Sequence, residues 1–260
     1  MKTKILNKKT VLSVISLLVI SALGSSVILF AQHKDKEQQF ILEMQSEEDE
    51  YRKVFDTKLQ ELIDYCRNDP KIGFSSYNGH LLETEKYKEI EHLGIEYLPY
   101  MIDHIEKNPD RYADALIVAV QKIAKTYINE GYNSPNEWIV LWNDYVKSIP
   151  QKVSEIKKEM KKNKSKKADL VQFGVLAIPL ILEDVKAGNE EMADVVRTIL
   201  SSDLIVPDEE IPENLKDKSI LKSWVDDTVP KDNDKEKWNA WIAENKGTYM
   251  KIKERVLKVK

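Results

Sequence analysis

The sequence has little cysteine and little glycine. Cys66 is the only cysteine among 260 residues, so the chain has no intramolecular disulfide and cannot form a cysteine-rich zinc site. The 8 glycines are scattered, and none has the spacing of a phosphate-binding loop. Scarce glycine with abundant glutamate, lysine, leucine and isoleucine favours helices over sheets. We therefore predict an all-α fold held by its apolar core, with Cys66 packed as a small apolar side chain.

Motifs of common active sites are also absent. The four histidines do not form the H-E-x-x-H pattern of zinc proteases, and no serine lies in G-x-S-x-G. Residues 232–236 resemble part of a calcium loop, but the glycine and the distal glutamate that such a loop needs are missing. We expect no metal, no cofactor and no catalytic residue. The histidines are His33, His80, His92 and His104.

The charge is unevenly distributed along the chain. The formal net charge is −4, and the first 31 residues carry four lysines and no acid, so the remainder carries a net charge of −8. Phosphate groups would repel an acidic domain of this kind, so nucleic acid is not an expected partner.

One long hydrophobic run is present, and it covers residues 11–31 without a charge. At 1.5 Å per residue such a helix spans roughly 30 Å, about the hydrocarbon thickness of a bilayer. The four lysines before it predict that the N-terminus is cytoplasmic and that the rest of the chain lies outside. A single-pass anchor is favoured over a signal sequence cleaved near Gly24 or Ala31, which would make the protein secreted.

The rest of the sequence contains an internal repeat. Residues 94–120 align without a gap onto residues 174–200, so that Gly94 matches Gly174 and Pro99 matches Pro179. Apolar positions agree between these anchors. Because one such unit cannot cover its own apolar face, it must pack against a neighbour. The predicted core residues are Leu93, Leu98, Ile102, Ile105, Leu116, Val120, Phe173, Ile178, Leu182, Val185, Val196 and Leu200.

Further helices follow from periodicity and from capping signals. Residues 34–66 have the pattern of a long amphipathic helix. Asn108-Pro109 is a helix start with Asn108 as the cap, and the pairs Ser134/Glu137 and Asn233/Glu236 are capping boxes. The helices after these two boxes carry Trp138 with Trp142, and Trp238 with Trp241. Another short helix is expected to hold Trp224.

These patterns divide the chain into five parts. They are a basic cytoplasmic tail (1–10), the anchor or signal sequence (11–31), a juxtamembrane amphipathic helix (32–72) and two helical lobes (73–163 and 164–260). Each lobe holds one repeat and one helix with two tryptophans. The second lobe also holds an acidic loop over 201–217.

The segments EKYKEIEHLGIEYLPYMIDHIE and KKADLVQFGVLAIPLILEDVK resemble the helix–glycine–helix–proline units of HEAT-like repeats. The resemblance extends over about 75–200 and is closest to exported or membrane-anchored HEAT-like proteins of low-GC Gram-positive bacteria. It implies an α-α superhelix with an interaction role, and it offers no catalytic residues. Because the copies are few and separated by a long helix, a compact two-lobed helical domain is an equal alternative.

Two groups of residues are candidates for a binding surface. Aromatic side chains dominate binding hot spots, although tryptophans also pack repeats against neighbouring helices, which is the favoured interpretation here. Residues 157–167 hold seven lysines that can contact an anionic polymer or lipid, or can form a solvated helix end. The candidate residues are Tyr97, Tyr100, Trp138, Trp142, Lys161, Lys162 and Lys164.

The function expected from these patterns is a non-enzymatic, membrane-anchored scaffold or binding module for a protein or a cell-envelope polymer. An envelope hydrolase or peptidase, with a site assembled from scattered Asp, Glu and His residues, is the alternative. A third interpretation is a passive stalk or sensor, in which the helix over 34–66 transmits a signal across the membrane. The oligomeric state and the partner do not follow from the sequence.

Overall fold

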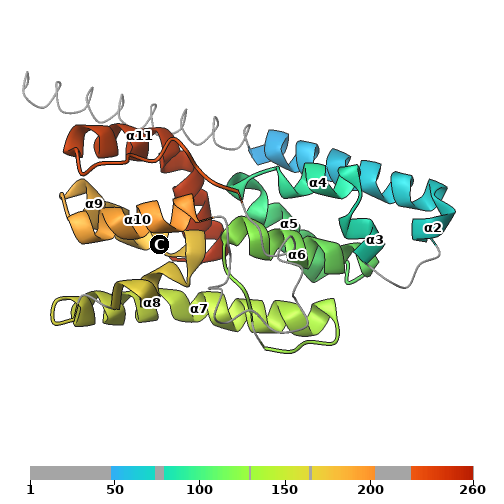
Figure 1. The fold of residues 1–260 in the computed structure, drawn as a ribbon. Helices are drawn as coiled ribbons and strands as arrows, with labels where there is room; N and C mark the ends of the chain where they lie inside the picture. Colours follow the sequence, from blue (N-terminus) through green and yellow to red (C-terminus); the bar gives the residue numbers. More distant parts are fainter. Residues whose placement is uncertain (1–47, 74–78, 129, 164–165, 203–223, 260) are drawn as a thin grey trace, which may run out of the picture. The chain divides into compact units, whose positions relative to one another are not determined.

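The computed structural model describes residues 48–73, 79–128, 130–163, 166–202 and 224–259, and these residues contain helices and no strand (Figure 1). The chain divides into two units, Met1–Tyr51 and Arg52–Lys260. The predicted segment over 11–31 and the first part of the predicted helix over 34–66 lie outside the described residues. No helix within the described ranges has the length and apolarity needed to cross a membrane. Of the first unit only residues 48–51 are described, and they are helical.

The second unit is built from helices throughout its described ranges. Its first part contains a helix that ends at residue 68, followed by short helices and two longer ones. These are α2 (Pro70–Gly73), α3 (Gly79–Leu82), α4 (Glu85–Glu91), the 3₁₀ turn η1 (Ile95–Tyr97), α5 (Leu98–Lys107) and α6 (Arg111–Ala124). The later elements are α7 (Pro135–Met160), α8 (Lys167–Val171), η3 (Gly174–Leu176), α9 (Ile178–Lys186), α10 (Glu190–Ser201), α11 (Lys235–Lys251) and the π-helical turn η6 (Ile252–Val256).

The same order of elements occurs twice. A short helix, a 3₁₀ turn and two longer helices form α4, η1, α5 and α6, and then α8, η3, α9 and α10. Both glycines of the repeat have a positive φ. Gly94 (φ 92°) directly precedes η1, and Gly174 (φ 55°) is the first residue of η3. Pro99 and Pro179 lie in the first turn of α5 and α9, where a missing amide hydrogen costs least. We refer to these four-element units as the first and second repeats.

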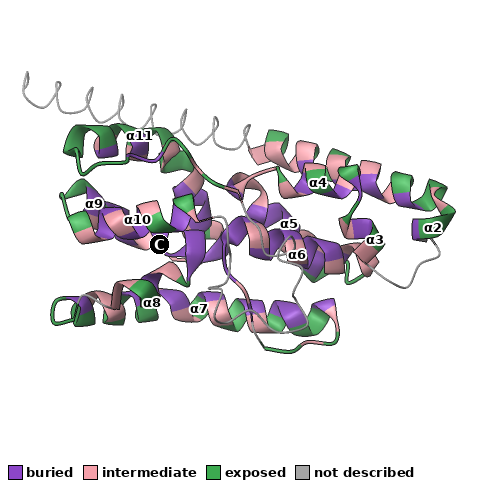
Figure 2. Cartoon of the chain, in the orientation of Figure 1, coloured by how far each residue is buried: buried purple, intermediate pink, exposed green. Residues whose placement is uncertain are grey.

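The repeats are joined by α7 and by direct contacts. α7 packs against α5 and α6 near its start and against α8 near its end (Figure 1). η3 contacts α6, and η6 contacts α5. α11 packs on α9. Buried residues concentrate on α5, α6, α9 and α10 (Figure 2). All of the predicted core residues are buried except Leu93 and Ile102, which are partly exposed.

Helix starts follow the predicted signals with two corrections. Ser134 caps α7, as predicted, and Asn189 caps α10. Asn108, in contrast, ends α5, and the cap of α6 is Asp110, whose carboxylate accepts from the amides of Tyr112 (2.9 Å) and Ala113 (3.0 Å). A carboxylate that accepts two bonds and lies at the positive end of the helix is a better cap than the amide two residues earlier.

The second correction concerns the start of α11. Asp234 caps it by accepting from the amides of Glu236 (2.9 Å) and Lys237 (3.2 Å), whereas Asn233 accepts a bond from Arg197 (3.0 Å). The predicted helix around Trp224 is also wrong for the described part, because residues 224–226 are not helical. α7 continues through Pro150 to Met160.

Candidate functional site

Three of the four candidate aromatic residues are buried, in agreement with the packing role that the sequence favours over a binding surface. Trp138, Trp142 and Tyr100 are at most 1% exposed. The two tryptophan rings stack with centroids 5.1 Å apart, and the i,i+4 spacing places both on the face of α7 that packs against α5 and α6. These three side chains therefore pack the core and cannot reach a partner in this conformation. Tyr97 is partly exposed at the end of η1.

The ring of Tyr100 contacts two guanidinium groups. The ring is 5.0 Å from Arg52 and 4.8 Å from Arg255, measured from the ring centroid to Cζ. Both arginines also approach one carboxylate, that of Asp103, at 3.0 and 4.0 Å. This cation–π arrangement ties the helix that contains Arg52 and the C-terminal η6 to α5.

The lysine-rich segment is brought to a groove in the second unit. The C-terminal half of α7 forms one wall, and α9 with the start of α10 forms the other. The groove has a volume of about 380 Å³ and is partly open to solvent. Its lining residues are Pro150, Val153, Ser154, Lys157, Lys158, Met160, Lys161, Leu180, Asp184, Asn189, Glu191 and Met192. Of the three lysines predicted to bind, Lys161 lines the groove, Lys162 is exposed outside it, and Lys164 lies outside the described residues.

The floor of the groove is apolar. Val153, Met160 and Met192 are at most 3% exposed and close it from below. Leu180 and Pro150 are partly exposed, so their side chains are accessible to a ligand. The methylene stems of the lysines add further apolar area along the rim. The accessible lining therefore combines apolar side chains with charged ones, which suits a ligand that carries both kinds of group.

The rim has charges of both signs on different walls. Lys157 pairs with Asp184, and this pair links α7 to α9. Lys158 near the end of α7 and Lys161, the residue that follows this helix, are exposed and form no ion pair within the described residues. Glu191 lies on the opposite wall at the start of α10. The α7 edge is therefore positive, and the α9–α10 edge carries the carboxylates.

The remaining lysines of the segment serve the structure. Lys166 pairs with Asp169 (2.8 Å), and this hydrogen bond raises its pKa. Lys167 pairs with Asp194, and this hydrogen bond lowers the pKa of the aspartate. These two lysines hold α8 in place, so they are not available for a ligand in the way that Lys158 and Lys161 are.

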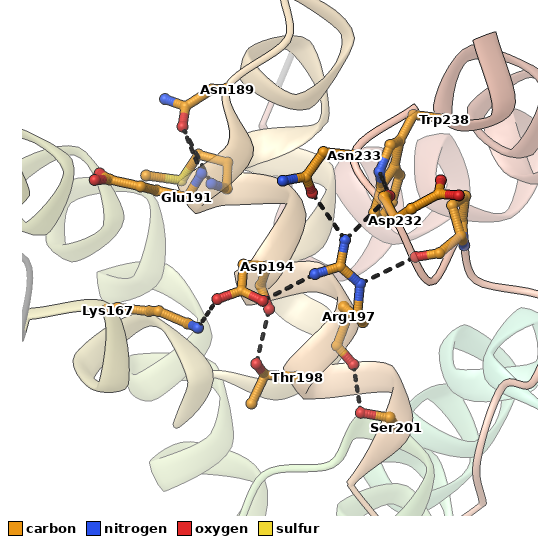
Figure 3. A network of polar contacts seen from close by, with 12 residues as sticks. Lys167, Asn189, Glu191, Asp194, Arg197, Thr198, Ser201, Asp232, Asn233 and Trp238 are labelled. Carbon is orange, nitrogen blue, oxygen red and sulfur yellow. Dashed lines mark hydrogen bonds and ion pairs between the residues drawn. The ribbon is translucent and has the colours of Figure 1, made fainter. Parts of the chain in front are cut away.

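Arg197 lies on α10, whose first residues line the groove, and is the centre of a network of polar contacts (Figure 3). Its Nε donates to the carbonyl of Pro230 (3.0 Å), and Nη1 donates to Asp194 (2.9 Å). Nη2 donates to the carbonyl of Asp232 (3.2 Å) and to the amide oxygen of Asn233 (3.0 Å). The guanidinium therefore fastens the segment before α11 onto α10. No sequence pattern indicates this role, because three of the four acceptors lie more than thirty residues away and two of the four are backbone carbonyls.

The junction between the repeats depends on Gly174, which the repeat pattern identifies, and on Lys125, which no sequence pattern indicates. Lys125 ends α6 in a left-handed conformation (φ 52°) and is 4% exposed. Its Nζ donates to the carbonyls of Ser202 (2.5 Å) and Trp224 and lies 4.6 Å from the Trp224 ring centroid. The Trp224 indole in turn donates to the carbonyl of Ile123 (3.1 Å). These contacts join the C-terminus of α6 to that of α10.

Groups with catalytic potential are dispersed in the described residues. No three His, Cys, Asp or Glu side chains of these ranges are placed to hold a metal ion. Cys66 is fully buried, and burial raises the pKa of its thiol, which disfavours the reactive thiolate. His80 and His92 are exposed, His104 is half-buried with its pKa lowered by burial, and His33 lies outside the described residues.

The described residues thus define an all-helical protein with two copies of a four-element unit and one lysine-rimmed groove. Comparisons with protein-family models, with curated proteins and with solved structures found no match.

Proposed function

We propose that this chain is a non-enzymatic binding module, tethered to the outer face of a bacterial cytoplasmic membrane, which docks a protein or a cell-envelope polymer in the groove between α7 and α9–α10. The observation that carries the proposal is the combination of an apolar floor with two exposed lysines, Lys158 and Lys161, on one edge. Buried apolar contacts supply affinity, and rim charges supply orientation and speed of association.

Support for the tether comes from the sequence. The uncharged run over 11–31 has the length of a membrane-spanning helix, and the four lysines before it favour an external location for the rest. The HEAT-like pattern of the two repeats is consistent with an interaction role, since repeat units of this kind present extended binding surfaces.

A photocrosslinking experiment tests the groove directly. A benzophenone amino acid replaces Ser154, which is exposed and lines the groove, in the full-length chain expressed in its own cells. The matched control replaces Lys152, which is exposed on the same helix and does not line the groove. We expect a discrete adduct from position 154 that is absent from position 152. The proposal is refuted when neither position gives an adduct or when both give the same ones.

Protease accessibility tests the location. In intact spheroplasts, external protease should digest the part after the run over 11–31, and it should leave a cytoplasmic marker intact. Protection of the chain until the membrane is permeabilised would contradict the external location.

A further inference from the structure

The groove has the chemistry of a polypeptide site rather than of a polyanion site. Resting on the function proposed above, we infer that its occupant is a protein segment with apolar side chains and with acidic residues on one edge only. The apolar side chains lie on Pro150 and Leu180, and the acidic residues face Lys158 and Lys161.

The first argument is the distribution of charge. Lys157 is already paired with Asp184, which leaves Lys158 and Lys161 as the exposed cations of the α7 edge. The other wall carries Asp184 and Glu191 and no cation among its lining residues. A ligand with negative charge along its whole length therefore meets exposed cations on the α7 edge alone, and its remaining charges gain no partner in the groove. A ligand with acids on one edge matches this one-sided distribution of positive charge.

The second argument is the apolar lining. A uniformly charged polymer has no group that gains from contact with Leu180, and its charges would lose hydration over the apolar floor. A polypeptide gains from placing an apolar anchor there, because buried anchors provide most of the binding energy of a protein interface.

The third argument is size and openness. Ligand pockets have volumes of about 300–1,000 Å³ and enclose most of a small molecule. This groove, at about 380 Å³, is at the low end of that range and is partly open to solvent. It therefore accommodates one or two large side chains of a longer segment and does not enclose a whole ligand.

The inference is tested with three fluorescent peptides of equal length and the full-length chain in detergent micelles. The first peptide repeats Leu-Leu-Glu-Glu, the second is polyglutamate, and the third repeats Leu-Leu-Lys-Lys. We expect the first to bind with the lowest Kd by fluorescence anisotropy, and the other two to bind at least about tenfold more weakly, as a few apolar and charged contacts imply.

Two double variants with the same change in net charge locate the site. The variant K158E/K161E reverses the charge of both exposed lysines on the positive edge. The control K147E/K152E reverses the charge of two exposed lysines of α7 that do not line the groove. We expect the first variant to weaken binding of the Leu-Leu-Glu-Glu peptide about tenfold, and the second by less than about threefold. Leu180→Ser should weaken the same peptide several-fold. Circular dichroism of each variant establishes that the fold is retained.

The outcomes separate the two proposals. Equal binding of polyglutamate and the Leu-Leu-Glu-Glu peptide, both sensitive to K158E/K161E, overturns the polypeptide inference and leaves the groove as a site for an anionic polymer. Preferential binding of the Leu-Leu-Lys-Lys peptide overturns the assigned charge of the partner. Peptide binding that both double variants weaken equally overturns the inferred location. No peptide binding, combined with no photocrosslink at position 154, refutes the groove as a binding site altogether.

Discussion

Gly174 is the residue at which a single methyl group should disturb the fold most. A Cβ built on it would lie 2.2 Å from the carbonyl oxygen of Ala124 and 2.3 Å from that of Lys125. Both neighbours are backbone atoms at the end of α6, so no side chain can move aside. Relief of the overlap requires η3 and α6 to separate at the junction between the two repeats.

The expected loss for Gly174→Ala follows from two contributions. Left-handed backbone costs an alanine about 1–2 kcal/mol, and forcing a methyl group into a packed site costs about 1–3 kcal/mol. The lower entropy of the unfolded alanine chain offsets about 0.4–1 kcal/mol. We therefore expect the free energy of unfolding to fall by about 3 kcal/mol, measured by urea denaturation of the full-length chain with tryptophan fluorescence.

Two other glycines provide controls for this experiment. Gly188 also has a positive φ, of 94°, but a Cβ there meets nothing within 4 Å. Gly188→Ala therefore isolates the backbone strain of about 1–2 kcal/mol, and with the same entropic offset the expected loss is about 1 kcal/mol. Gly131 has open space and no positive φ, so Gly131→Ala should change stability by less than about 0.5 kcal/mol. A loss for Gly174→Ala no larger than that for Gly188→Ala would refute the close approach as the reason for glycine at this position.

The remaining predictions concern side chains. Arg197→Lys should lower the free energy of unfolding by about 2–3 kcal/mol, because several hydrogen bonds of the guanidinium are lost. The control Arg67→Lys, on an exposed helix face, should have little effect. Equal effects of the two variants in urea denaturation would contradict the Arg197 network. Hydrogen bonds from Lys86 and Lys58 lower the pKa values of Glu61 and Glu89. The two glutamates therefore stabilise the fold above the ordinary glutamate pKa of 4.5, and this stabilisation is lost as the pH falls below that pKa. E61Q/E89Q should flatten the acid limb of a curve of unfolding free energy against pH, and an unchanged curve would contradict this. Cys66 should react with a maleimide only after unfolding in urea, so rapid labelling of the native chain would contradict its burial. Gly94→Val should lower the Tm through strain at φ 92°, and an unchanged Tm would contradict that strain.

The parts of the fold that depend on neighbours in the sequence could be predicted. Apolar periodicity locates α5, α6, α9 and α10, and most of the core residues inferred from it are buried. The predicted caps of α6 and α11, Asn108 and Asn233, are wrong, because Asp110 and Asp234 cap these helices. Several Asn and Asp residues precede each helix, and the local backbone conformation decides which of them is the cap. Leu93 is partly exposed because it lies in the turn after α4 rather than on an inward helix face.

The parts that depend on distant neighbours could not be predicted. The sequence leaves open whether Trp138 and Trp142 face a partner or the core, because their i,i+4 spacing fits both, and only the packing of α5 and α6 on α7 decides it. The sequence indicates only one wall of the groove. The lysine-rich segment is recognisable by its composition, whereas Leu180 and Met192 on the other wall have no feature that distinguishes them from core residues. The role of Lys125 at the junction could not be predicted from the sequence, because its acceptors are backbone carbonyls about 75 to 100 residues away.

The single ammonium group of Lys125 holds the carbonyls of both Ser202 and Trp224, the residues that flank positions 203–223. The C-terminus of α10 and the start of the next described range are thereby held to the C-terminus of α6 by one charged group. Exchange of this lysine for methionine would leave both carbonyls without their donor in a single step.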